Sequence, residues 1–156
     1  MSVERVKGCL KKYQRENDVL EFSSSSATVE LAAQAVGVVP ARIAKTLSLH
    51  DHESCMVVVA AGDAKLDNAA FKGRFRIKAR MLTSEEALQK TGYAVGGVCP
   101  FALPEGVTVW LDESLLRFET VFPACGSSNS AIEITPKDLE VISKSSGWVN
   151  VCKGWK

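Results

Sequence analysis

One stretch of the chain, residues 23–49, constrains the fold more than any other. Apolar residues recur at three-and-four spacing through 29–36, a pattern typical of one face of a helix. Gly37 suits the left-handed residue that ends a helix, and Pro40 suits the first turn of the element that follows. Residues 43–49 then predict a strand, so a helix, a sharp stop and a strand are expected in quick succession.

A single lysine, Lys45, interrupts this otherwise apolar strand, whose neighbouring side chains include Ile43, Ala44 and Leu47. A lysine in such a setting extends its ammonium to water, pairs with an acid, or points into a pocket. The pattern alone leaves open both a surface lysine and a functional one.

The rest of the chain predicts more strands than helices. The four serines at 23–26 are explained as capping residues of the helix that begins at Thr28. A polar turn containing His50 and His52 predicts a hairpin between 47–49 and 55–61. Strands and helices do not alternate strictly, which favours a mixed α+β architecture over a doubly wound sheet. Further helices are predicted at 2–15, 64–71, 83–92 and 135–142, and further strands at 19–22, 74–81, 107–111, 120–124 and 131–134. Residues 147–156 are predicted to return as a strand or a packed tail.

Length and composition indicate a single domain spanning residues 1–156, with 46% hydrophobic and 24% charged residues. A net charge of +1 argues against tight, sequence-independent binding of nucleic acid. No apolar run approaches the length of a membrane span, and the first 17 residues lack the apolar core of a signal peptide. Five scattered cysteines without a C-x-x-C pair favour a reduced, cytoplasmic protein without a metal.

Conventional catalytic groups are few. His50 and His52 lie in the predicted turn and have no recognisable third partner, so a metal site or a catalytic triad built on them is disfavoured. Cys99 invites comparison with a nucleophile, but a small buried thiol is the interpretation we favour.

Two glycine-containing loops are candidate pocket walls. The loop from Gly96 to Pro100 and the loop from Gly126 to Asn129 can turn backbone N–H groups toward a ligand, or can be plain turns. Neither matches the phosphate-binding loop of nucleotide hydrolases. A pocket formed by these loops and Lys45 holds one cation, several backbone donors and little acid–base equipment, which suits an ester substrate attacked by water.

Three ordered blocks extend this interpretation. Residues 28–47 (TVELAAQAVGVVPARIAKTL), the Gly-x-x-x-Pro loop within 91–100, and IEITPKDL at 132–139 resemble the YbaK / prolyl-tRNA synthetase-associated editing domain family. The blocks fall in the family's order across residues 23–143. The resemblance implies a mixed, partly closed β-barrel flanked by helices.

The resemblance also implies an activity, the hydrolysis of misacylated tRNA, and a site. In that site Lys45 is the essential residue, and its ammonium is expected in a pocket bounded by 96–100 and 126–128. No cofactor and no metal are expected. The candidate substrate-binding residues are Thr28, Thr46, Gly96, Gly97, Val98, Cys99, Pro100, Gly126, Ser127 and Ser128.

The expected substrate is the acceptor end of tRNA(Pro) carrying a small wrong amino acid such as Ala or Cys, hydrolysed in trans. The binding free energy by which a synthetase pocket discriminates against a smaller amino acid is only about 1–3 kcal/mol per methylene. A separate site must therefore hydrolyse the mischarged tRNA. Prolyl-tRNA synthetase is the second expected partner, while a membrane and DNA are not expected. The alternative is a non-catalytic module that binds tRNA or a synthetase, and it is motivated by near-neutral charge and the absence of an obvious general base. An unrelated small-ester hydrolase leaves the block order unexplained.

Overall fold

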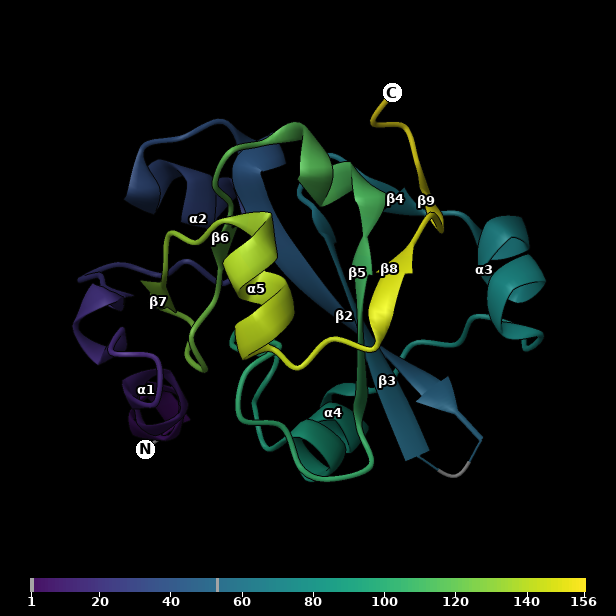
Figure 1. Cartoon of the computed structure of the whole chain (residues 1–156), viewed down its shortest axis with the longest axis horizontal. Coiled ribbons are helices and arrows are strands. Elements are labelled where there is room, and N and C mark those ends of the chain that lie inside the picture. Colours follow the sequence, from purple (N-terminus) through teal and green to yellow (C-terminus); the bar gives the residue numbers. More distant parts are fainter. Residues whose placement is uncertain (1, 53) are drawn as a thin grey trace.

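The computed structural model describes residues 2–52 and 54–156, and a curled five-stranded sheet is its central feature (Figure 1). The long strands β2 and β3 are antiparallel, whereas β6 joins β2, β5 joins β3 and β8 joins β5 in parallel. β3 lies in the middle of the sheet, and its last seven residues are buried, as its run of valines requires. The strands follow the order β6 (Phe122–Pro123), β2 (Ile43–Asp51), β3 (Ser54–Ala61), β5 (Thr108–Asp112) and β8 (Gly147–Val149).

Helices and two short strand pairs surround this sheet, so the fold is the expected mixed α+β arrangement with a partly closed barrel. No helix in the described residues is long and apolar enough to cross a bilayer. The helices are α1 (Ser2–Lys11), α2 (Val29–Val36), α3 (Asn68–Phe75), α4 (Ser84–Thr91) and α5 (Pro136–Ile142), with 3-10 turns η1 (Glu16–Asp18), η2 (Pro40–Arg42) and η3 (Glu113–Arg117). The short pairs are β1 (Leu20–Glu21) with β7 (Ser130–Ala131), and β4 (Lys65–Leu66) with β9 (Cys152–Lys153).

The predicted course of residues 23–49 is confirmed in its main steps. The Thr28 hydroxyl accepts a hydrogen bond from the Leu31 N–H at 3.1 Å and caps α2. Gly37 has φ of 84° and ends the helix, its N–H donating to the Ala33 carbonyl. Pro40 then opens a single 3-10 turn that leads directly into β2. The chain therefore turns back on itself, and α2 lies against the first residues of β2, the strand that carries Lys45.

Two other helix starts follow their sequence signals. Thr83 and Glu86 form a reciprocal capping box, with N–H to side-chain distances of 3.1 and 2.9 Å, and Gly92 ends α4 at a φ of 83°. Thr135 caps α5 by accepting from the Asp138 N–H, and Pro136 occupies the first turn.

The segment 64–81 differs from its prediction. The helix expected at 64–71 is displaced, because Lys65 and Leu66 pair with β9 and the Asp67 carboxylate caps a helix that starts at Asn68. The strand expected at 74–81 is absent, since α3 runs on to Phe75 and only Met81 forms a bridge, to Leu49. The alternation of apolar and basic residues in 74–81 therefore reflects that one side of the segment faces the core. It does not reflect a continuous ladder of hydrogen bonds to a neighbouring strand.

Three smaller predictions are also corrected. The first helix ends at Lys11 rather than residue 15, and Tyr13 lies outside it. His50 belongs to β2, where it pairs with Cys55, and not to the turn. The serine run does not cap α2: the N–H and hydroxyl of Ser26 both donate to the Ser128 carbonyl, joining two distant chain segments.

Candidate functional site

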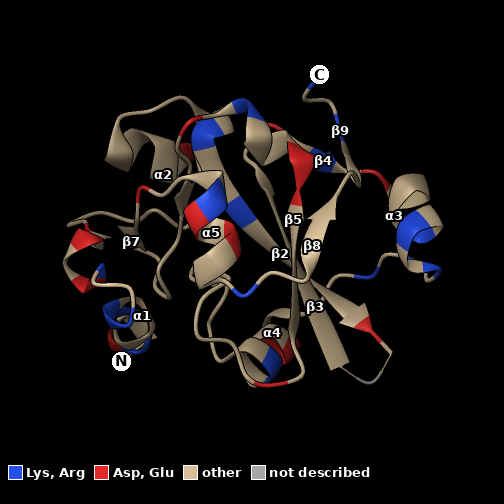
Figure 2. Cartoon of the chain, viewed as in Figure 1, with Lys and Arg blue, Asp and Glu red and all other residues tan. Residues whose placement is uncertain are grey.

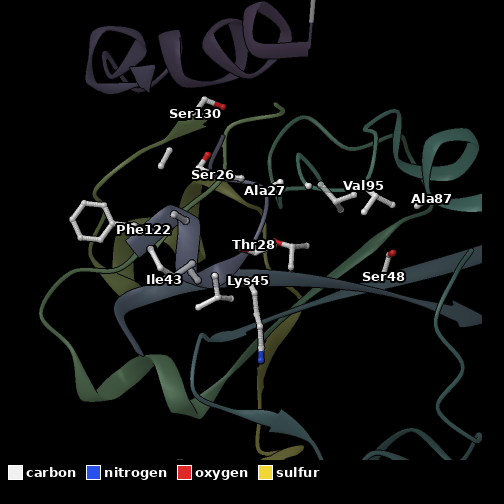
Figure 3. A pocket seen from close by; sticks show the side chains of 18 of the residues that line it. Ser26, Ala27, Thr28, Ile43, Lys45, Ser48, Ala87, Val95, Phe122 and Ser130 are labelled. Atoms are coloured by element: carbon white, nitrogen blue, oxygen red, sulfur yellow. The ribbon is translucent and has the colours of Figure 1, made fainter. Parts of the chain in front are cut away.

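A cavity of about 310 Å³ lies against β2 (Figure 3). Five chain segments contribute to its wall: 26–32, 43–48, 81–87, 95–98 and 122–131. The wall is small and mostly apolar, with hydroxyl groups between the apolar side chains. Lys45 is the one ionisable side chain among the described residues that line it. Its alanines are Ala27, Ala32, Ala44, Ala87, Ala124 and Ala131, and its hydroxyl residues are Ser26, Thr28, Thr46, Ser48 and Ser130.

The cavity wall includes a gap in the hydrogen-bonded edge of β2. β6 pairs only with Ile43 and Ala44, and farther along the same strand the Ser48 carbonyl accepts a hydrogen bond from the Leu82 N–H at 3.0 Å. Residues 45–47 lie between these two pairings. The hydroxyl oxygen of Thr46 is buried there without a hydrogen-bond partner among the described residues. An unpartnered buried hydroxyl is costly, which makes it a ready partner for a ligand oxygen or nitrogen.

Lys45 stands at the edge of the cavity, but its ammonium is not directed at the two glycine loops as expected. Figure 3 shows the side chain running away from Ser26 and Ala27, and the ammonium donates a hydrogen bond to the Ala64 carbonyl. The reason is the alternation of side chains along β2, which sends Lys45 and Thr46 to opposite faces. Burial lowers the pKa of Lys45, and the nearby Cys152 thiol and Asp63 carboxylate oppose that effect.

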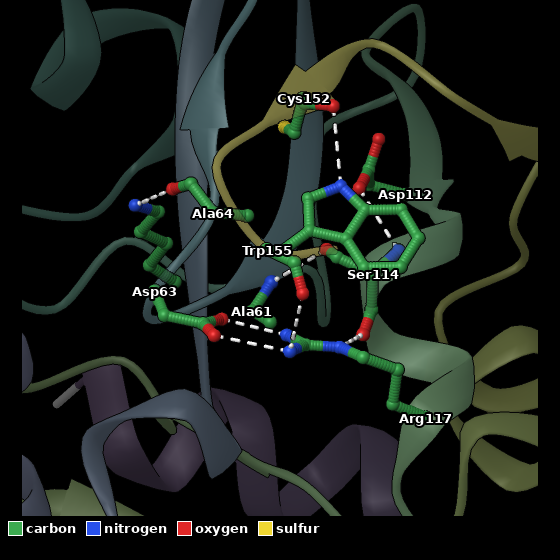
Figure 4. A network of polar contacts seen from close by, with 9 residues as sticks. Ala61, Asp63, Ala64, Asp112, Ser114, Arg117, Cys152 and Trp155 are labelled. Carbon is green, nitrogen blue, oxygen red and sulfur yellow. Dashed lines mark hydrogen bonds and ion pairs between the residues drawn. The ribbon is translucent and has the colours of Figure 1, made fainter.

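The carbonyl that holds Lys45 belongs to a loop fixed by a polar network (Figure 4). The Arg117 guanidinium makes two hydrogen bonds to the Asp63 carboxylate, at 2.6 and 3.0 Å, and a third to the Trp155 carbonyl at 3.1 Å. The hydrogen bonds of Arg117 lower the pKa of Asp63 and keep it ionised. The turn between β3 and β4, which contains Ala64, is therefore tied to the C-terminal tail.

The two glycine loops meet behind the cavity. Gly96 has φ of 92°, and a Cβ there would lie 3.0 Å from the Cβ of Ala27. A Cβ on Gly97 would lie 2.9 Å from the backbone of Ser127, and the bonds from Ser26 to Ser128 close the same junction. Glycine is needed at position 96 because φ is positive and the Ala27 side chain is close, and at position 97 because the Ser127 backbone is close.

The structure divides the predicted site residues into two groups. One group lines the cavity and comprises Thr28, Lys45, Thr46, Gly96 and Val98. The other group is not part of the lining: Gly97, Cys99, Pro100, Gly126, Ser127 and Ser128. Lining residues that the sequence did not single out include Ser26, Ala27, Ser48 and Ser130. Small residues in loops and strands carry no distinctive signal, and the serine run was assigned to capping.

Cys99 has the environment of a structural thiol. It is fully buried, and its sulfur lies 3.8 Å from the Phe101 carbonyl oxygen. Burial raises the pKa of Cys99 to about 12, so the thiol is protonated at neutral pH. The same carbonyl accepts from the Tyr93 hydroxyl at 2.5 Å. These contacts fix the end of the Gly96–Pro100 loop.

The histidines do not converge on a metal site. His50 Nε2 lies 3.3 Å from a carboxylate oxygen of Glu86, whereas His52 is largely exposed beside Asp51. Across residues 2–52 and 54–156, no three His, Cys, Asp or Glu side chains gather in a way that could hold a metal ion.

Comparison with known proteins identifies the family. The model of the aminoacyl-tRNA editing domain matches residues 23–142, which is most of the chain and includes the whole cavity wall. The chain belongs to the aminoacyl-tRNA editing domain family. This membership agrees with the ordered blocks around Lys45, Gly96 and Thr135.

Three individual proteins are similar to this editing domain. The chain is 53% identical to the uncharacterized protein YwhH of Bacillus subtilis over the full length of both chains. It is 25% identical to EbsC of Enterococcus faecalis, named a "putative Cys-tRNA(Pro)/Cys-tRNA(Cys) deacylase", over 88% of this chain and 82% of that one. Its fold matches a crystal structure described as a "putative trans-editing enzyme for prolyl tRNA synthetase", with a TM-score of 0.88, 29% identity and 98% of each chain covered.

Proposed function

We propose that this editing domain is a free-standing, cytoplasmic deacylase that hydrolyses the ester of mischarged tRNA in trans. The observation that carries the proposal is the cavity: a small, mostly apolar chamber with hydroxyl groups and a single cation at its edge. Such a chamber suits the aminoacyl end of a tRNA, because the side chain needs apolar contacts and the ester oxygens need hydrogen-bond donors or positive charge.

The chemistry follows from what the wall contains. A water molecule adds to the ester carbonyl carbon, the bond to the ribose oxygen breaks, and the proton from the water passes to that ribose oxygen. Negative charge develops on the carbonyl oxygen during this step. We assign its stabilisation to the Lys45 ammonium, after its side chain turns toward the cavity, and we assign the Thr46 hydroxyl to binding another polar group of the substrate.

To stabilise the oxyanion, the Lys45 ammonium must exchange its hydrogen bond to the Ala64 carbonyl for one to the substrate. The Ala64 carbonyl that it now contacts is a neutral acceptor, whereas a developing oxyanion is a charged one. The four-carbon side chain stands at the cavity edge, so the exchange needs rotation of side-chain bonds and no movement of β2. The described lining residues offer no histidine or carboxylate as a general base, so proton transfer is left to groups on the substrate and to water.

The amino acid removed is proposed to be small. Six alanines line a chamber of about 310 Å³ that must also admit the terminal ribose. tRNA(Pro) as the substrate is supported by the names of two relatives, a "putative Cys-tRNA(Pro)/Cys-tRNA(Cys) deacylase" and a "putative trans-editing enzyme for prolyl tRNA synthetase". We therefore propose tRNA(Pro) carrying Cys, Ala or a similar residue, with the synthetase as second partner.

The test is a panel of mischarged tRNAs incubated with the purified protein. Release of Cys, Ala or Ser from tRNA(Pro), well above spontaneous hydrolysis and with Pro-tRNA(Pro) spared, is the expected result. The absence of a general base among the described wall residues favours one competing function, a module that binds charged tRNA without consuming it. Saturable binding of mischarged tRNA with no release of amino acid would establish that module and refute the deacylase.

A further inference from the structure

A row of cations lies on the segment that follows β4. Between Asp67 and Glu85 the chain has no acidic residue, and five of its nineteen lysines and arginines fall within nine positions. The remaining fourteen cations are outnumbered by the eighteen acids, so the near-neutral total conceals a strongly positive segment. We call this segment the basic row; it consists of Lys72, Arg74, Arg76, Lys78 and Arg80.

Packing forces the basic row outward. Phe75, Ile77 and Ala79 alternate with the cations and are packed against the hydrophobic core. All five cations of the row are consequently exposed. Figure 2 shows them as blue segments on α3 and on the chain that leads back from it toward the sheet.

The basic row lacks acidic partners, in contrast to other cations of the protein. Arg15, Arg42 and Arg117 each form an ion pair with a carboxylate. None of the five row residues does so within the part of the chain that the structure describes. Arg74 packs its guanidinium over the rings of Phe75 and Trp110, at 5.1 and 4.9 Å. Exposed, unneutralised charge of one sign is a surface suited to a polyanion.

The basic row ends next to the wall of the cavity. The Arg80 carbonyl accepts a hydrogen bond from the His50 N–H at 2.9 Å, and the Leu82 N–H donates to the Ser48 carbonyl. These bonds fix the end of the row to β2, next to residues 45–47, which lie between the two pairings of that edge. The next two residues, Met81 and Leu82, line the cavity itself. A polymer whose end occupies the cavity can therefore pass directly over the row.

We propose that the basic row binds the sugar-phosphate backbone of the tRNA acceptor arm as it leaves the cavity. This inference rests on the proposed function, since it is the esterified end that positions the backbone. Phosphate groups are regularly spaced anions that need no base-specific contact, so unpaired lysines and arginines bind them without reading sequence.

The experiment removes charge from the row without disturbing its packing. The triple variant Arg76→Gln, Lys78→Gln, Arg80→Gln leaves Arg74 on its rings and keeps the main-chain bond of residue 80. The matched control neutralises three exposed lysines elsewhere, Lys12→Gln, Lys137→Gln and Lys144→Gln. Thermal unfolding of both variants checks that the fold is retained.

Two substrates separate the row from the cavity: mischarged full-length tRNA, and a short substrate without phosphate groups, the aminoacyl ester of adenosine. On full-length tRNA the row variant should raise KM at least tenfold. The slope of log kcat/KM against log salt should flatten by about 0.7–0.9 for each phosphate that the variant no longer neutralises. On the short substrate the row variant should have the same KM and kcat as the parent protein. The control variant should have the parent values on both substrates.

Other outcomes overturn the proposal. Equal activity of row variant and parent on full-length tRNA would show that the backbone passes elsewhere, and equal losses on both substrates would show that the row acts on the cavity. If the parent hydrolyses neither substrate, the proposed function fails, and the row is judged by binding of uncharged tRNA instead. Salt-dependent binding that the row variant loses would preserve the inference. Binding to phosphatidylserine vesicles in place of tRNA would reject it.

Discussion

The ammonium of Lys45 donates a hydrogen bond to the main-chain carbonyl of Ala64, whereas the hydroxyl of the next residue, Thr46, is buried without a partner among the described residues. Adjacent residues of β2 thus present a cation on one face and an unpartnered hydroxyl on the other. The carbonyl is held by a turn that Asp63 and Arg117 tie to the C-terminal tail. Under the proposed function, a substrate in the cavity competes with that carbonyl for the ammonium.

Removing the Lys45 ammonium should abolish most deacylation. Lys45→Ala is expected to lower kcat on mischarged tRNA by on the order of 10²–10³, because one electrostatic donor to the developing oxyanion is removed. Lys45→Arg should restore little, since a planar guanidinium does not replace a compact ammonium in a small chamber. Lys65→Ala, which removes a nearby exposed lysine outside the cavity wall, is the control and should retain activity. Parental rates in Lys45→Ala would show that the site lies elsewhere.

Gly96 and Gly37 form a matched pair for testing the loop. Both have positive φ, of 92° and 84°, so alanine strains the backbone at either position by about 1–2 kcal/mol. A Cβ at Gly37 meets nothing within 4 Å, whereas one at Gly96 presses on Ala27 in the cavity wall. Steady-state kinetics should show a raised KM for Gly96→Ala only, with similar losses of thermal stability in both variants. Equal KM values for Gly96→Ala and Gly37→Ala would show that the Gly96 loop does not contribute to substrate binding.

Native protein should expose one reactive thiol. Cys9 is partly exposed, while Cys55, Cys99, Cys125 and Cys152 are buried and none of the five forms a disulfide. Brief treatment with iodoacetamide at pH 8, followed by mass spectrometry, should give one adduct on Cys9, and five adducts after unfolding in denaturant. Rapid modification of Cys99 in the native state would contradict the buried, protonated thiol, and fewer than five adducts after unfolding would indicate a disulfide.

Stability should fall at alkaline pH partly through Cys99. Its pKa is raised from 9.0 to about 12 by burial, so the folded state favours the protonated thiol. That contribution is fully present below pH 9 and is lost progressively as pH rises from 9 toward 12. Denaturant unfolding between pH 8 and 10.5 should therefore show a shallower decline for Cys99→Ala than for the parent. If the free energy of unfolding declines equally with pH in Cys99→Ala and the parent, this thiol does not contribute to the pH dependence of stability.

Local signals predicted much of the fold because they act within a few residues. Thr28, Gly37, Thr83 and Gly92 occupy helix ends as predicted, since capping depends on neighbouring backbone groups alone. The same reasoning failed between 64 and 81. There Lys65 and Leu66 pair with a strand at the far end of the chain, a partner that no local pattern reveals.

The candidate site divides in the same way. Sequence alone singled out Lys45, the Gly96 loop and the family, because residue type and order carry those signals. Tertiary structure decided which face of β2 the lysine ammonium takes, that Ser26 joins the Gly126–Asn129 loop, and that the basic row ends beside the cavity. Each of these depends on contacts between segments distant in sequence, and such contacts arise only when the sheet has brought those segments together.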